Sequence, residues 1–565
     1  MLTIGVDTFD LITIKFQDWR IILILLKYLR IFKILKTKYR INFYKMSKFN
    51  RNKLDYFFYI IILFVFFNIF FADENNYILL FFGLIFVNFF ILNIKKIKIN
   101  LFSSFSFLLY FIFSFFSLKS SINKEKSLTI ILNDCVLFII YIYCLNKKEV
   151  VKKNFINLIH IISIILFPLF ILSIFFNLNF YLPSRSLLYS YSHSQIGNLF
   201  SIFFVMEKSF YWKIILLIGV LFSQSRTAYF ALLIYFVINF FRYKKLNIKS
   251  INLLFIFIFL FSIIISTLGF FNKKHLLGNR EKYIIQGLKY IKNHSKLIFD
   301  SVGAGNFNYI SQKYAENPGE ITVSSHNLFF DILLERGVLA LIFFLFFLFN
   351  LIKKAKNDKY KISFILINVI FLLDFSFIYP IFLIFYYILA GLIDHSDREL
   401  KSNYINFFSY LFYLIILFFF ISHSLTNYRF YNLAYFINPL NYKAVQGIIE
   451  KKIKESDFIE VEKYIRIYNK IIYDANSSLN CFNYFIKLNN KKEGLFFYEK
   501  YLLNSPLNLD YLPGFYELAV EVYKNERKAK EMTFKLLEKI EKESQPLDEK
   551  SLLAKKIYFF KKRLN

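Results

Sequence analysis

Cysteine is scarce in this sequence, and its scarcity excludes two kinds of site. The 565 residues include three cysteines, and no two of them have the spacing of metal ligands: they are Cys135, Cys144 and Cys481. A structural zinc site or a disulfide framework needs several cysteines at short, regular intervals. We therefore expect neither a disulfide staple nor a metal site built from cysteines.

Acidic residues are also few. The chain has 39 Asp and Glu residues and 71 Lys and Arg residues, which gives a formal net charge of +32. A surplus of this size is typical of proteins that bind nucleic acid. Here, however, the basic residues lie in short tracts between apolar runs, for example at 95–98, 147–153 and 242–245. Cytoplasmic loops of membrane proteins have this distribution under the positive-inside rule. We therefore expect membrane lipid, and not nucleic acid, as a partner.

The N-terminal segment does not have the pattern of a secretory signal, and we expect none in it. The apolar stretch at 21–26 is short, and basic residues interrupt the segment after it: Lys27, Arg30, Lys33 and Lys36. We interpret residues 1–50 as a basic N-terminal segment that forms an interfacial helix. Translation could start at Met1 or at Met46, and both alternatives stay open.

Hydrophobic residues make up 57% of the chain, and they recur in apolar runs almost from end to end. A soluble domain of this length does not need repeated apolar stretches of about 20 residues, which is the length that crosses a bilayer. We count about thirteen such runs, several of them short for a crossing helix. The sequence therefore predicts an all-α fold, a polytopic transmembrane helical bundle with about 12–13 spans.

Charge placement also predicts the domain organisation. With the N-terminus inside, the Lys-rich tracts are cytoplasmic and residues 51–424 form the transmembrane domain. The long segment 272–327 and everything after Ser422 then lie on the outer face, together with 223–227. A connection as long as 272–327 is usually functional, so we expect an extracytoplasmic catalytic loop there.

The C-terminal residues 425–565 change to a soluble helical pattern, with apolar positions three and four apart. The sequence Asn438-Pro439-Leu440-Asn441 recurs 67 positions later as Ser505-Pro506-Leu507-Asn508, and Asp474-Ala475-Asn476 lies near the midpoint. This spacing is about twice 34 residues, and a repeat of about 34 residues is typical of tetratricopeptide-like helix pairs. We predict an extracytoplasmic tetratricopeptide-like helical domain, with an irregular helical tail as the alternative.

The outer loop contains the most promising chemical groups. Its segment 281–299 predicts an amphipathic helix at the membrane surface. Gly303 and Gly305 come next, and a glycine pair permits a tight turn and a close backbone approach. His326 stands at the first turn of the next helix, where an imidazole can accept a proton at neutral pH, although a lone histidine is more often structural.

Two arginines occupy comparable positions at the outer boundary. Arg226 lies in Ser225-Arg226-Thr227-Ala228 between two short apolar helices, and Arg280 begins the amphipathic helix. A charged residue at a helix–membrane boundary is costly unless it is paired or hydrated. The planar guanidinium suits bidentate contact with phosphate oxygens. The structural alternative is an arginine that extends its head group to the water.

The order of these motifs resembles the O-antigen ligase and polymerase superfamily. The matching residues are Ser225-Arg226-Thr227-Ala228, Gly303-Ala304-Gly305-Asn306-Phe307, and His326-Asn327 with Glu335 and Gly337. The resemblance covers about residues 192–337, and the other spans match only as helices.

This resemblance implies inverting, metal-independent transfer of a glycan, without a cofactor, from a polyprenyl-diphosphate-linked donor on the outer face of the bacterial cytoplasmic (inner) membrane. It implies that Arg226 and Arg280 hold the diphosphate, and that His326 activates or orients the acceptor hydroxyl. It further implies that Asn327, Gly303 and Gly305 contribute to substrate binding. The implied acceptor is lipid A core or a protein.

Several alternatives remain open. A polymerase of the same superfamily would use the same donor chemistry to extend one lipid-linked glycan with another. A transporter or flippase would carry buried intramembrane charge, for which Asp374 is the best candidate. A hydrolase could use Asp331 and Glu335. The C-terminal domain favours a ligase, because helical repeats present surfaces that bind partners.

Overall fold

The structure is a computed structural model, and it describes residues 96–175, 193–242, 280–294, 301–355 and 358–564. All of these residues belong to one compact unit, Ile60–Asn565. The predicted interfacial helix in residues 1–50, the alternative start at Met46 and the apolar runs before residue 96 lie outside the described residues. So do residues 272–279 and 295–300 of the outer loop.

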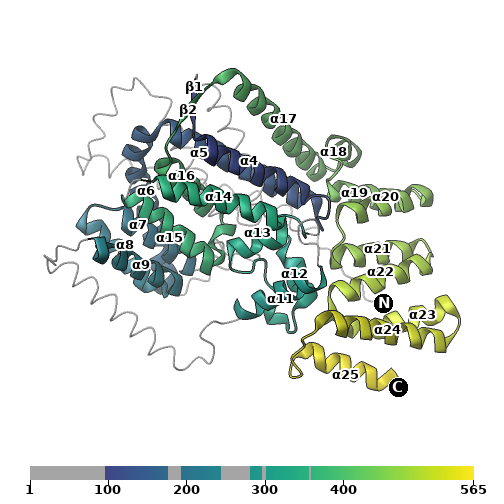
Figure 1. Cartoon of the computed structure of the whole chain (residues 1–565). Coiled ribbons are helices and arrows are strands. Elements are labelled where there is room, and N and C mark those ends of the chain that lie inside the picture. Colours follow the sequence, from purple (N-terminus) through teal and green to yellow (C-terminus); the bar gives the residue numbers. More distant parts are fainter. Residues whose placement is uncertain (1–95, 176–192, 243–279, 295–300, 356–357, 565) are drawn as a thin grey trace. The chain divides into compact units, whose positions relative to one another are not determined.

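The described chain is almost entirely helical (Figure 1), in agreement with the all-α prediction. The helices that precede the outer loop are α4 (Leu101–Phe116), α5 (Lys124–Asn146), α6 (Lys148–Phe175), α7 (His193–Met206), α8 (Phe210–Ser223) and α9 (Arg226–Arg242). The outer loop and its exit hold α11 (Arg280–Asn293), α12 (Phe307–Tyr314), η3 (Pro318–Glu320) and α13 (Leu328–Arg336). The next helices are α14 (Val338–Lys354), α15 (Lys359–Leu373), η4 (Phe375–Ile378), α16 (Pro380–Ile393) and α17 (Ser402–Asn427).

Two short strands accompany these helices. β1 (Lys96–Ile99) pairs antiparallel with β2 (Arg398–Lys401), and Lys96 lies opposite Lys401. The pair brings the start of α4 next to the segment that follows α16, where Leu101 N donates to Asp397 Oδ1 at 2.9 Å, although the two segments are far apart in the sequence.

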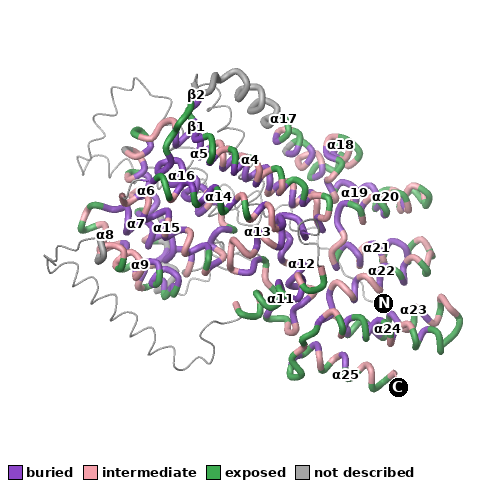
Figure 2. Tube along the Cα trace, in the orientation of Figure 1, coloured by how far each residue is buried: buried purple, intermediate pink, exposed green. Residues whose placement is uncertain are grey.

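Helix α4 exposes large apolar side chains on one face. Phe105 is 55% and Phe116 is 67% exposed, whereas the buried face holds Phe107 together with serines such as Ser103 and Ser114. Helix α14, which packs on α4, also exposes apolar side chains, namely Ile342, Leu345, Phe346 and Phe349 (Figure 2). A row of exposed apolar side chains is unusual for a surface in water, so this outer surface suits contact with hydrocarbon.

Among the described residues, two helices are long and apolar enough to cross a membrane, Lys124–Asn146 and Lys148–Pro168. Shorter apolar helices accompany them: Leu101–Phe116, Ser194–Met206, Phe210–Ser223, Arg226–Asn239, Pro380–Ile393 and Leu414–Asn427. The predicted count of 12–13 spans stays a prediction.

The apolar run from Leu328 to Ile352 is expected from the sequence to form one span, but the structure divides it. Gly337 has φ +91° and ψ 170°, which ends α13 and starts α14 in a new direction. Arg336 just before the break is buried and pairs with Asp134 of α5, while its guanidinium also donates to Ser114. A buried ion pair with a further hydrogen bond satisfies the charge and holds α13 against α4 and α5.

The C-terminal residues form α18 (Tyr431–Ile437), α19 (Tyr442–Lys454), α20 (Phe458–Ile471), α21 (Ala475–Lys487), α22 (Lys491–Asn504), η5 (Pro506–Tyr511), α23 (Leu512–Tyr523), α24 (Glu526–Ser544) and α25 (Leu552–Leu564). Successive helices lie side by side in pairs (Figure 1). The motifs that predicted turns do lie between helices: Asn441 caps α19 by accepting from Ala444 N, and Asp474 caps α21 by accepting from Ser477 N. The tetratricopeptide-like repeat itself stays a prediction.

These C-terminal helices pack directly on the connection between α4 and α5. Tyr473 N donates to Ile122 O at 3.1 Å, and the Tyr473 hydroxyl donates to Ser120 O at 2.7 Å. The same connection pairs with the outer loop, where Ile122 N donates to Val302 O at 3.0 Å. The C-terminal helices are therefore part of the framework that supports the outer loop.

Replacing Gly337 with alanine should lower the free energy of unfolding by about 1 to 3 kcal/mol, because the backbone angles at this position are open essentially to glycine alone. Thermal unfolding of the purified protein in detergent measures the effect. Gly319→Ala is the matched control, since a Cβ at Gly319 meets nothing within 4 Å. Equal melting temperatures for the two variants would contradict the role of Gly337.

Candidate active site

The first part of the site is the turn between α8 and α9. Gln224 adopts a left-handed conformation with φ 51°, and Ser225 Oγ then accepts from Ala228 N at 3.2 Å. Ser225 Oγ also donates to Asn198 Oδ1 of α7 at 2.9 Å. These bonds fix the first turn of α9, which begins at Arg226, and the Arg226 side chain is exposed.

The second part is Asp374, at the end of the apolar helix α15. Its side chain is fully buried and accepts hydrogen bonds from Ser194 Oγ at 3.2 Å, Asn198 Nδ2 at 3.1 Å and Thr227 Oγ1 at 3.4 Å. A buried carboxylate must be paired and hydrogen-bonded to remain charged. Asp374 therefore ties together α7, α9 and α15.

The third part is Arg280, the first residue of α11. Its Nη2 lies 3.8 Å from Asp374 Oδ2, and its side chain is 36% exposed while Asp374 is 0% exposed. Arg226 and Arg280 are close enough to repel each other electrostatically. With Arg280 beside the buried carboxylate and Arg226 near Arg280, net positive charge remains at an accessible surface, which is the arrangement that attracts an anionic ligand.

The fourth part is His326, in the turn that precedes α13. His326 adopts a left-handed conformation with φ 63°, and its backbone N donates to Ser324 Oγ at 3.0 Å. Ser324 Oγ in turn donates to the buried carboxylate of Asp331 at 2.7 Å, and Ser325 N donates to the same carboxylate at 2.9 Å. This network forces the turn, because a non-glycine residue at positive φ needs local support.

The His326 ring lies between two aromatic rings. Tyr283 of α11 stacks on it with a centroid distance of 5.0 Å, and Phe375, next to Asp374, meets it edge-on at 4.4 Å. Its Nδ1 is buried and has no hydrogen-bond partner among the described residues. Burial, together with the nearby charge of Arg280, lowers the pKa of His326 to about 4, so the ring is neutral at physiological pH.

The structure therefore brings three of the predicted site residues together. Arg226, Arg280 and His326 come from three separate segments: Arg280 is near both of the others and pairs with Asp374, and His326 contacts Phe375. Their predicted roles toward substrate remain proposals. Sequence reasoning noted Asp374 as a sign of a transporter, but its position beside Arg280 became visible only in the fold.

The other three predicted site residues take part in local structure. Asn327 caps α13, because its Oδ1 accepts from Phe329 N at 3.0 Å and Phe330 N at 3.1 Å. Gly303 and Gly305 have φ +86° and +76°, and a Cβ on either would lie within 2.4 Å of α5 or of the connection before it. These contacts account for all three residues without a ligand, so their substrate role stays a prediction.

Glu335 explains why the glycine turn has its shape. Its carboxylate accepts from Gly305 N at 2.7 Å and from Phe307 N at 2.9 Å. Glu335 is buried, and these bonds anchor the turn on α13. This arrangement gives Glu335 a structural role and removes support for a hydrolase that would use it with Asp331, whose carboxylate holds the His326 turn.

No group of three or more His, Cys, Asp or Glu side chains in the described ranges is arranged to hold a metal ion.

Outward-facing apolar helices with a polar site at their ends are characteristic of a membrane protein. Residues 213–345 match the family model described as O-antigen ligase, and this segment contains Arg226, Arg280 and His326. This segment is therefore similar to the O-antigen ligase family, which supports the resemblance seen in its motifs. No curated protein and no solved structure matches the chain.

The depressed pKa of His326 predicts a pH-dependent contribution to stability. The unfolded histidine takes up a proton near pH 6.5, whereas the folded one does so only near pH 4. Stability from this residue is therefore fully present above pH 6.5 and is lost as the pH falls toward 4.

Melting temperatures between pH 7.5 and pH 4 should consequently fall less steeply for His326→Gln than for the wild type. His395→Gln, at an exposed histidine, is the control. If the melting temperature of His326→Gln falls with pH as steeply as that of the wild type, the pKa of His326 is not lowered in the folded protein.

Proposed function

We propose that the chain is a polytopic glycosyltransferase of the bacterial cytoplasmic membrane. It would transfer a glycan from a polyprenyl diphosphate to an acceptor hydroxyl on lipid A core or on a protein. The observation that carries the proposal is that Arg280 lies near Arg226, near His326 and beside the buried carboxylate of Asp374, and that the two arginines and the histidine all fall inside the segment that matches O-antigen ligase. The outer loop and the C-terminal helices would then face the extracytoplasmic side.

The exposed apolar faces of α4 and α14 support the membrane setting. Phenylalanine and leucine side chains that cover the outside of a helix pair are stable where the surrounding solvent is hydrocarbon. A site at the ends of α9, α11 and α15 would then lie at the depth of the lipid head groups. A diphosphate attached to a polyprenyl chain is held at that depth by its own anchor.

The arginines suit the donor. A glycan that leaves its diphosphate transfers negative charge to the phosphate oxygens, and fixed guanidinium groups stabilise that charge without reorganisation. Asp374 holds Arg280 in place by an ion pair at 3.8 Å, while Thr227, beside Arg226, donates to the same carboxylate. One buried acid thereby positions both cations.

His326 suits the acceptor. In the proposed step the acceptor oxygen forms a bond to the anomeric carbon while the bond from that carbon to the diphosphate oxygen breaks. The electron pair leaves with the diphosphate, which Arg226 and Arg280 hold, and the hydroxyl proton passes to the neutral imidazole. A single displacement of this kind inverts the anomeric centre.

Donor binding would prepare the histidine for this role. In the free protein Arg280 contributes to the low pKa of His326, after burial itself. A bound diphosphate offsets the charge of Arg280, which raises the pKa of His326 toward its ordinary range. The base would become stronger only when the leaving group is in place.

The contacts of Asp374 bear on the transporter alternative. Its carboxylate receives three side-chain hydrogen bonds and lies beside Arg280, which makes it a part of the arginine site and not an isolated intramembrane charge. The polymerase alternative uses the same donor site and differs in the acceptor, so an assay of products separates the two.

The direct test is transfer in vitro with purified full-length protein, a polyprenyl-diphosphate glycan, and lipid A core or surface proteins as acceptors. Wild-type protein should label one acceptor class with or without EDTA. His326→Ala should reduce the rate by about 100- to 10,000-fold, as is usual when a general base is removed. His423→Ala is the matched control.

Two other outcomes would redirect the proposal. A ladder of longer lipid-linked glycans without labelled acceptor would identify a polymerase. The absence of any covalent product from well-folded protein would exclude glycan transfer and favour transport.

The arginine role predicts that charge alone is not enough at position 226. Arg226→Lys should reduce the transfer rate by about 100-fold, close to the loss in Arg226→Ala, because a point charge cannot replace a bidentate fork. Arg527→Lys, at a side chain that is 91% exposed, controls for the chemical change. Wild-type activity in Arg226→Lys would refute bidentate binding by Arg226.

A further inference from the structure

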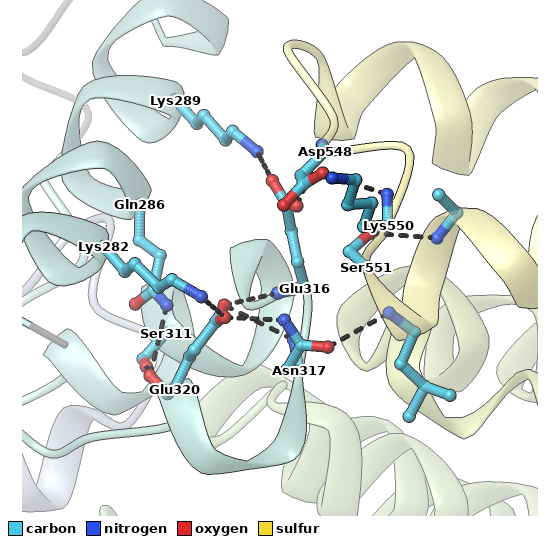
Figure 3. Close-up of polar contacts among 12 residues, drawn as sticks. Lys282, Gln286, Lys289, Ser311, Glu316, Asn317, Glu320, Asp548, Lys550 and Ser551 are labelled. Atoms are coloured by element: carbon cyan, nitrogen blue, oxygen red, sulfur yellow. Dashed lines mark hydrogen bonds and ion pairs between the residues drawn. The ribbon is translucent and has the colours of Figure 1, made fainter. Parts of the chain in front are cut away.

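The turn that comes after α12 connects two distant parts of the chain. It contains Glu316, Asn317 and Glu320, and it lies between the arginine-bearing helix α11 and the C-terminal helices (Figure 3). Its side chains form ion pairs with α11 on one side and accept backbone hydrogen bonds from the C-terminal helices on the other.

Glu320 binds the first two turns of α11. Its buried carboxylate pairs with Lys282 and also accepts from Asn317 Nδ2 at 2.7 Å and from Glu316 N at 3.1 Å. Its backbone oxygen accepts from Gln286 Nε2 at 3.1 Å. Burial alone would raise the pKa of the Glu320 carboxyl, but the bonds from Lys282, Asn317 and the Glu316 amide outweigh it and lower the pKa below its ordinary value.

Glu316 binds the next turn of α11 and the C-terminal helices together. Its Oε1 lies 2.7 Å from Lys289 Nζ, and both side chains are largely buried. Its Oε2 accepts from Asp548 N at 3.0 Å, and its backbone oxygen accepts from Leu553 N at 3.1 Å. Asn317 Oδ1 adds a bond from Leu552 N at 3.0 Å.

Further contacts reinforce the connection. Lys313 of α12 pairs with Glu543 of α24 at 3.0 Å, and Asn293 at the end of α11 donates to Glu543 O at 3.0 Å. Helix α11 is therefore held along its length by groups that belong to the turn or to the C-terminal region.

The position of α11 matters because its first turn carries Arg280 and Tyr283. Lys282, the partner of Glu320, lies between them in the sequence. Arg280 reaches Asp374 at 3.8 Å, and Tyr283 stacks on His326. A small rotation of α11 would move both contacts at once.

We propose that Glu320 is a positioning residue for Arg280, and that the turn 316–320 couples the C-terminal helices to the donor site. Glu320 acts through Lys282 and sets the rotation of α11. Glu316 and Asn317 hold the turn against residues 548–553. The inference rests on the proposed function in one respect, namely that Arg280 contacts the donor.

The test compares donor KM and kcat in full-length protein in nanodiscs. Glu320→Gln should raise the donor KM about tenfold, within the usual range of coupling between sites, and should lower kcat as well, because a displaced α11 moves Arg280 from the leaving group and Tyr283 from His326. Lys282→Met breaks the same ion pair by changing its exposed member, and it should give the same result. This variant keeps the test decisive if Glu320→Gln folds poorly. Glu462→Gln, which breaks an exposed ion pair on α20, should behave as wild type.

The exchanged pair Lys282→Glu with Glu320→Lys should give a lower donor KM than Glu320→Lys alone, since it restores opposite charges, but recovery should be incomplete because a lysine cannot accept from Asn317 and the Glu316 amide. Hydrogen exchange supplies a readout that does not depend on activity. Amides of 280–293 should exchange faster in Glu320→Gln and in Glu316→Ala than in Glu462→Gln.

The outcomes separate the two proposals. If the wild type transfers glycan but Glu320→Gln and Lys282→Met keep its donor KM, the positioning role is wrong. If α11 exchange is also unchanged in Glu316→Ala, the coupling is wrong. If the wild type transfers nothing while α11 exchange responds as expected, the coupling stands and the proposed function fails.

Discussion

The buried carboxylate of Asp374 is the group on which the site depends. It accepts hydrogen bonds from α7 and α9 and lies 3.8 Å from the guanidinium of Arg280 on α11. A fully buried carboxylate is costly without such partners, so the segments that carry them are held where they can reach it. The two arginines are near each other in spite of their repulsion because this carboxylate and its donors fix both helix starts.

Much of the fold follows from local rules that can be read in the sequence. Apolar runs became helices, and Asn441 and Asp474 cap helices where turns were expected. The motifs that mark the family also have physical explanations. Ser225 fixes the start of α9, Glu335 anchors the glycine turn, and Gly337 breaks a long apolar run into two helices.

The sequence could not indicate which motif residues meet a ligand and which support the chain. Gly303 and Gly305 resemble residues for close substrate approach, yet their positive φ and their contacts with the α5 side are explained by packing. Asp374 sits in an apolar run and resembles a transporter charge until Arg280, from a distant segment, is placed beside it. The ion pairs of Glu316 and Glu320 were equally invisible, because side chains distant in sequence give no periodic signal.

The C-terminal helices have a clearer physical role than their sequence pattern implied. They donate hydrogen bonds to the turn 316–320 and to the connection before α5, so they support the outer loop from two directions. An acceptor-binding surface on these helices is compatible with that role, since the same framework would hold acceptor and donor in register.

The most direct test of the central claim is the affinity for a polyprenyl diphosphate, measured by native mass spectrometry on wild-type protein and on Asp374→Asn. An anion site organised by Asp374 predicts that Kd rises about tenfold in Asp374→Asn, because a charge-assisted contact that fixes Arg280 is worth about 1.5 kcal/mol or more. Asp358→Asn, at the other end of α15, should leave Kd unchanged. An unaltered Kd in folded Asp374→Asn protein would contradict the claim that this carboxylate organises an anion site.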